Sequence, residues 1–209
     1  MRDAFSTALY GVYACFHPFS GFWEIKHRRK NSFGGALIVL FFLCLAIVAK
    51  LQLTDFIFTQ NSPEDNNIFL ELLYVLLPLA MWVVVNWSIT TLFEGKATMK
   101  VIFITTVNAL IPLILLFIPQ IILSYFFTLN ENVYYVAIGT FAVIWSVWNL
   151  MAGLSAVQDY GLVKTILTTI ATLIAMVAIV FLFGIFYSSL QQFVGFLLTV
   201  YEEIKYLTI

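Results

Sequence analysis

Residues 33–49 read FGGALIVLFFLCLAIVA, an unbroken apolar stretch that closely follows the basic run KHRRK at residues 26–30. A helix of about 20 residues, rising ~1.5 Å per residue, crosses the ~30 Å hydrocarbon core of a bilayer. Apolar stretches of similar length recur along the rest of the chain. The sequence therefore predicts an all-α integral membrane protein.

The overall composition points to the same class. Of the 209 residues, 62% are hydrophobic and 10% are charged, and the mean hydropathy is +1.00. Soluble domains carry about 25% charged residues. The two cysteines, Cys15 and Cys44, have no spacing typical of a disulfide framework or a metal site.

Polar breaks divide the chain into a short N-terminal segment, residues 1–32, and a membrane domain, residues 33–209. Within the membrane domain we predict a bundle of five transmembrane helices, followed by a C-terminal helix at 188–206 that continues the fifth span or bends at Gly195. Pro112 and Pro119 fall in the third span, which is expected to be the most distorted. The predicted spans are 33–57, 69–93, 101–127, 133–154 and 162–187.

The positive charges predict the orientation, because Lys and Arg are enriched in the short loops on the cytoplasmic side. An arrangement with the N-terminus inside and the C-terminus outside leaves two basic residues outside, Lys50 and Lys205. Eight would then lie inside: Arg2, Lys26, Arg28, Arg29, Lys30, Lys96, Lys100 and Lys164. We therefore expect a multi-pass protein of the cell membrane with a cytoplasmic N-terminus.

The N-terminal segment is predicted to form an amphipathic helix at the membrane interface. Phe5, Ala8, Leu9, Val12 and Phe16 recur at helical spacing, and Pro18 is expected to end the helix. Its basic run either fixes topology or contacts anionic lipid headgroups and partner proteins, at about 1 kcal/mol per Lys or Arg near an anionic leaflet. The candidate contact residues are His17, Pro18, Phe19, Phe22, Trp23, Lys26, Arg28, Arg29 and Lys30.

Four uncharged amide side chains lie within the predicted spans, namely Asn86, Asn108, Gln120 and Asn149. Such groups commonly form hydrogen bonds between helices, so we interpret them first as packing contacts. The alternative is a polar path through the bundle.

The sequence lacks the residue patterns of the common enzyme classes. The sequence has no Gly-rich phosphate loop, HExxH or GxSxG motif, and its two histidines, His17 and His27, both precede the first span. We therefore expect a non-enzymatic protein with no cofactor or metal, and the hydrophobicity argues against nucleic acid as a partner.

Several motifs resemble those of bacterial Yip1-domain membrane proteins. The most specific is HPFSGFWEIK at residues 17–26, directly before the first span. Looser matches are the Asn86-Trp87 pair, Glu94-Gly95-Lys96, and Ala109-Leu110-Ile111-Pro112. Asn108 departs from the pattern, because an aromatic residue is expected before Ala109.

The resemblance covers nearly the whole chain and implies five spans with the N-terminus inside. It also implies an accessory, adaptor or assembly role beside other integral membrane proteins, plausibly the permease subunits of a carbohydrate ABC importer. Two alternatives follow from the residues themselves. One is a small channel or carrier using Asn86, Asn108 and Asn149, and the other is a lipid-organising protein acting through its N-terminal helix.

Overall fold

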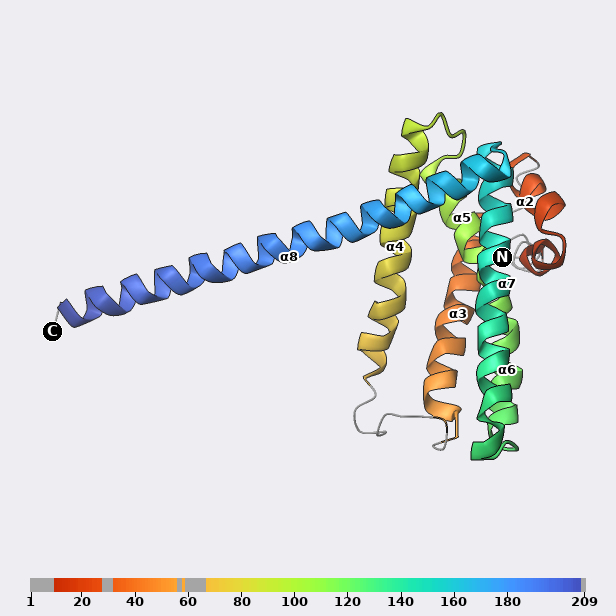
Figure 1. The fold of residues 1–209 in the computed structure, drawn as a ribbon, viewed down its shortest axis with the longest axis horizontal. Coiled ribbons are helices and arrows are strands. Elements are labelled where there is room, and N and C mark those ends of the chain that lie inside the picture. The colour runs from red at the N-terminus through yellow and green to blue at the C-terminus, as the bar shows by residue number, and fades with distance from the viewer. Residues whose placement is uncertain (1–9, 28–31, 56–57, 59–66, 208–209) are drawn as a thin grey trace.

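The computed structural model describes residues 10–27, 32–55, 58 and 67–207, and in these parts the regular elements are helices (Figure 1). A helical segment at residues 10–16 precedes α2 (Pro18–His27). The elements that follow are α3 (Phe33–Leu53), α4 (Ile68–Leu92), α5 (Met99–Ala109), α6 (Ile111–Ser124), the short 3₁₀ helix η2 (Leu129–Glu131), α7 (Asn132–Gln158) and α8 (Leu162–Leu207).

The prediction of five apolar helices long enough to cross a membrane is confirmed. They are α3, α4, the pair α5–α6, α7 and α8, with stretches of 21 to 38 residues that meet the length and composition of a span. α3 ends at Leu53, where the backbone N–H and the hydroxyl of Thr54 both donate to the Lys50 carbonyl. α7 continues to Gln158, beyond the residue at which the sequence analysis ended the fourth span.

The predicted distortion of the third span is also confirmed. α5 ends at Ala109 and α6 begins at Ile111, with Leu110 between them at φ −88° and ψ 1°. Pro112 lies in the first turn of α6. Proline lacks an amide hydrogen and disfavours a helical residue before it, so the break falls just upstream of it.

The bundle is formed by α3, α4, α5–α6 and α7, which run side by side (Figure 1). α7 packs against α5, α6 and α2, and α2 lies on the side of α7 away from α4 (Figure 1). We call the end of the bundle that carries Lys26, Lys96, Lys100 and Lys164 the basic end. It holds α2, the start of α3, the α4–α5 loop and the α7–α8 loop.

α8 differs from the predicted fifth member of a compact bundle. Near the basic end it packs on α4 and α7, with Thr165, Thr168 and Thr172 buried. Every described side chain from Val177 to Thr199 is exposed, and this part of the helix extends away from the bundle (Figure 1). The three threonines mark one face of the first turns, whereas residues 173–187 are almost entirely apolar and give no face a preference for the bundle.

Candidate functional site

The predicted contact residues that the structure describes lie at His17 and on α2, the second of two short helices that pack together on the bundle. Segment 10–16 and α2 meet at His17, and Pro18 occupies the first position of α2, where its missing amide hydrogen costs nothing. The hydroxyl of Tyr10 donates to a carboxylate oxygen of Glu24 at 2.7 Å and thereby joins the two helices. Pro18 therefore starts a helix as well as ending one, and the sequence pattern does not predict this second helix.

Small residues determine which face of segment 10–16 is buried. Gly11, Ala14 and Cys15 point inward, whereas Phe16, on the predicted apolar face, is 59% exposed. A Cβ atom on Gly11 would lie 2.3 Å from Oδ1 of Asn108. Small residues allow helices to approach closely, so the small face, rather than the larger apolar one, meets the bundle. Of the other predicted face residues, Val12 is partly buried, and Phe5, Ala8 and Leu9 lie outside the described residues.

Phe22 is the residue of the motif that fixes α2 to α7. It is fully buried, and a Cβ atom on Gly153 of α7 would lie 3.2 Å from its ring. Gly21 lies close against segment 10–16, because a Cβ atom on Gly21 would lie 2.5 Å from the Cα of Ala14. The structure thus places Phe22 beneath the candidate surface as its support.

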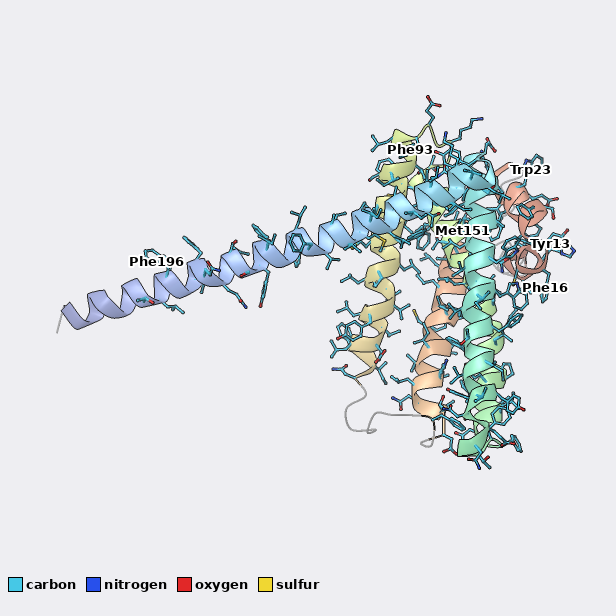
Figure 2. The ribbon with its side chains drawn as sticks, in the orientation of Figure 1. Tyr13, Phe16, Trp23, Phe93, Met151 and Phe196 are labelled. Carbon is cyan, nitrogen blue, oxygen red and sulfur yellow. The ribbon has the colours of Figure 1, made fainter. Side chains whose placement is uncertain are left out.

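The outer side of the pair carries an aromatic surface, which we define as Tyr13, Phe16, Phe19 and Trp23. These side chains are 46% to 59% exposed, and Figure 2 shows three of them at the outer edge of the N-terminal segment. Phe16 and Phe19 make edge contacts with Trp145 and Trp148 of α7, at centroid distances of 5.4 and 6.4 Å. The exposed His17 ring stacks on Tyr13 at 4.8 Å. The aromatic surface therefore continues from the motif onto α7.

Lys26 connects the motif to the α7–α8 loop. Its Nζ lies 2.7 Å from Oδ2 of Asp159, and Nζ of Lys96 lies 3.3 Å from the same oxygen. Asp159 ends α7 in the left-handed conformation at φ 57°, which Asp tolerates better than most residues. The hydrogen bond from Lys26 is the main cause that holds the pKa of Asp159 below its ordinary value, and Lys96 acts in the same direction. Arg28, Arg29 and Lys30, the rest of the predicted basic contact, lie outside the described residues.

Gln158 and Tyr160 tie the same loop to the α4–α5 loop. Oε1 of Gln158 accepts a hydrogen bond from the Ala97 amide at 3.0 Å. The hydroxyl of Tyr160 lies 2.8 Å from the Phe93 carbonyl and 3.1 Å from the Thr90 carbonyl. Burial raises the pKa of Tyr160, and the charge of Glu94 raises it further. The sequence patterns do not predict this network. The signal that could have indicated it is three consecutive polar residues, Gln158, Asp159 and Tyr160, shortly after a predicted span.

Three of the four intramembrane amides form a hydrogen bond between two elements, and the fourth, Asn108, bonds within its own helix. Asn86 donates to Thr172 of α8 at 3.2 Å, and Asn149 donates to Sγ of Cys15 at 3.5 Å. Asn108 donates to the carbonyl of Ile104 in its own helix at 2.7 Å. Gln120 of α6 donates to the Tyr135 carbonyl of α7 at 2.9 Å. These contacts support the packing interpretation, and a transport path through the amides stays a prediction.

The residues of the basic end that the structure describes do not meet the requirements of a metal site. Among them, no three His, Cys, Asp or Glu side chains lie close enough together to hold a metal ion. Two lysines of the basic end, Lys26 and Lys96, contact the carboxylate of Asp159, whereas Lys100 and Lys164 lie near aromatic rings. The arrangement offers positive charge and an exposed aromatic surface to a partner.

Together, these features define a multi-pass α-helical membrane protein with an N-terminal helical pair docked on its bundle. A profile of the Yip1 domain family matches residues 12–195, from the middle of segment 10–16 to the far part of α8. The chain belongs to the Yip1 domain family. No curated protein and no solved structure gives a significant match.

Proposed function

We propose that this Yip1-domain protein is a non-enzymatic adaptor that binds another integral membrane protein through α8. The observation that carries the proposal is the exposure of every described side chain from Val177 to Thr199. α8 has 46 residues and is therefore ~69 Å long, about twice the thickness of the hydrocarbon core. Its first turns suffice to hold it on α4 and α7, which leaves a full span available to a partner.

The basic end supplies a second contact in this proposal. The aromatic surface presents rings suited to the headgroup level of a membrane or to a partner's transmembrane helix. The basic run that follows α2 adds positive charge for anionic headgroups or an acidic loop of a partner. We further propose that this end faces the cytoplasm of a cell-membrane protein, and the count of Lys and Arg supports that orientation.

A finer form of the proposal names the partner as the permease subunit of a carbohydrate ABC importer. Its support is the resemblance to bacterial Yip1-domain proteins described above. A channel or carrier role has weaker support, because the amides that would form its path occupy separate helix contacts.

Photo-crosslinking in cells tests the adaptor proposal. A photoreactive phenylalanine analogue placed at Phe183, on the free part of α8, should capture a specific membrane protein that mass spectrometry can identify. Phe69 of α4 is similarly exposed and provides the matched control for chance collisions. The proposal fails if Phe183 captures only a second copy of the chain, or the same mixture of proteins as Phe69.

Reporter fusions test the orientation. Alkaline phosphatase fused after the C-terminus should be active and green fluorescent protein at the same place dark. The reverse pattern would contradict the N-in arrangement while leaving the crosslinking result interpretable.

A further inference from the structure

An apolar groove opens between α3, α4 and α5. Its volume is about 810 Å³, within the roughly 300–1,000 Å³ typical of small-molecule sites. One lining side chain, Lys100, is charged, and the apolar lining includes Phe33, Leu40, Leu76, Ala80, Val83 and Phe103. We propose that this groove is a binding site for one anionic phospholipid, with an acyl chain in the groove and the headgroup at Lys100.

Lys100 places a positive charge at one end of the apolar groove. Lys100 lies in the first turn of α5 at the basic end, and its Nζ is 5.9 Å from the centre of the Phe33 ring. That ring packs on Phe103 at a centroid distance of 5.2 Å, and both rings line the groove together with Lys100. A phospholipid has the matching distribution, with a charged group at one end and hydrocarbon beyond it.

The charge of Lys100 is also available to a ligand. Among the lysines of this end that the structure describes, Lys26 and Lys96 are paired with Asp159, and Lys164 lies 4.4 Å from the Tyr160 ring. Lys100 is exposed and has no acidic partner among the described residues. The N-cap of α5, Thr98, makes no side-chain capping bond with the described residues, so the first amides of the helix add partial positive charge beside Lys100.

The extent of the groove suits one leaflet. Its lining on α4 runs from Leu76 to Val84, which is ~12 Å along the helix axis. One leaflet contributes about half of the ~30 Å hydrocarbon core. Ala80 and Val84 are exposed along this length, so a chain can enter sideways from the bilayer.

Native mass spectrometry of the full chain, released from detergent with defined lipids, tests the proposal. With phosphatidylglycerol and phosphatidylethanolamine at equal concentration, we expect one bound lipid per chain and a preference for phosphatidylglycerol. Lys100→Gln should weaken phosphatidylglycerol binding about fivefold, as expected for one basic group at an anionic headgroup. Lys164→Gln removes the same charge at the same end but outside the groove, and should leave the preference unchanged.

A groove-filling substitution tests the acyl-chain part. Ala80→Trp should abolish retention of the lipid, and because Ala80 is exposed the larger side chain need not disturb the core. Ala137→Trp, at an exposed position of α7 outside the groove, is the matched control and should retain the lipid. If Ala80→Trp fails to fold, a phosphatidylglycerol with a diazirine in its acyl chain should label the α4 peptide that contains Leu76–Val84 in the wild-type chain.

Three results would overturn the proposal. The first is equal binding of the two lipids, or a Lys100→Gln variant that behaves like Lys164→Gln. The second is undiminished lipid on Ala80→Trp, or labelling spread evenly over the helices. The third is a wild-type dimer that Ala80→Trp converts to monomer, because the groove would then hold a helix of a second copy.

Discussion

Nζ of Lys26 and Oδ2 of Asp159 lie 2.7 Å apart, although 133 residues separate them in the sequence. This ion pair joins the N-terminal motif to the loop between α7 and α8. The side chains are 17% and 35% exposed, so the surrounding protein partly shields the ion pair from water. The contact of Lys96 with the same carboxylate is longer, at 3.3 Å, and its lysine is 68% exposed.

The two lysines should therefore contribute unequally to stability. We expect Lys26→Gln to lower the melting temperature in detergent more than Lys96→Gln, since exposed ion pairs contribute only about 0.2–1 kcal/mol. Asp159→Asn keeps a residue that accepts the left-handed conformation and removes the charge alone. A double-mutant cycle with Lys26→Gln and Asp159→Asn measures the coupling, and a coupling of zero would contradict an energetic role for the pair.

The same carboxylate should make the basic end sensitive to acid. The pKa of Asp159 lies below its ordinary value of 3.8, so the stabilisation is complete above pH 3.8 and is lost as the pH falls through the lowered pKa. We expect the difference in melting temperature between the wild type and Asp159→Asn to be constant from neutral pH down to 3.8 and to shrink below it. A difference that instead grows on acidification would contradict the lowered pKa of Asp159.

Close approach at Gly21 should make the helical pair intolerant of a methyl group. A Cβ there would lie 2.5 Å from the Cα of Ala14, so the backbone must move, and overpacking of this kind costs about 1–3 kcal/mol. Gly184 of α8 has no such neighbour within 4 Å. Gly21→Ala should thus lower the melting temperature, whereas Gly184→Ala should leave it equal or higher, because alanine favours a helix by ~0.5–1 kcal/mol.

The buried thiol of Cys15 reports whether the N-terminal pair is docked. Cys15 is 1% exposed, and burial raises its pKa to about 11 from 9.0, while the hydrogen bond from Asn149 acts in the opposite direction. That shift alone reduces the thiolate near pH 7 about 100-fold. In a Cys44→Ser background we expect very slow maleimide labelling of the wild type and faster labelling of Gly21→Ala. Rapid labelling of the wild type would contradict the docked arrangement.

Asn86 should hold the first turns of α8 on α4. Its amide donates to Thr172, and hydrogen bonds between membrane helices contribute roughly 0.6–2 kcal/mol. Asn86→Leu should destabilise the protein by that order and reduce disulfide crosslinking between cysteines placed on α4 and α8. Ser88 lies on the same helix, and among the described residues its hydroxyl donates only to the Val84 carbonyl one turn earlier in that helix. Ser88→Ala is therefore a suitable control.

The helices were predictable because a bilayer imposes their length and apolar character. A distortion of the third span was predictable because Pro112 lacks an amide hydrogen and disfavours a helix that continues through the residues before it. The identity of the buried face of segment 10–16 was not, since Gly11, Ala14 and Cys15 carry little hydrophobic signal and are selected by how closely helices approach. The partners of Asp159 were equally hidden, because Lys26 and Lys96 are distant from it in sequence. Nor could the apolar sequence of α8 reveal that half of it lies outside the bundle.

The Lys26–Asp159 contact also constrains the order in which the chain is assembled during translation. At about 5–20 residues per second, ribosomes need roughly 7–27 s to extend the chain by the 133 positions from Lys26 to Asp159. During that interval Phe22 has no Gly153 to pack against, so the nascent N-terminal helices must wait beside lipid or the insertion machinery. Their docking is a late, post-insertion step that closes the structure only when the loop after α7 has been made.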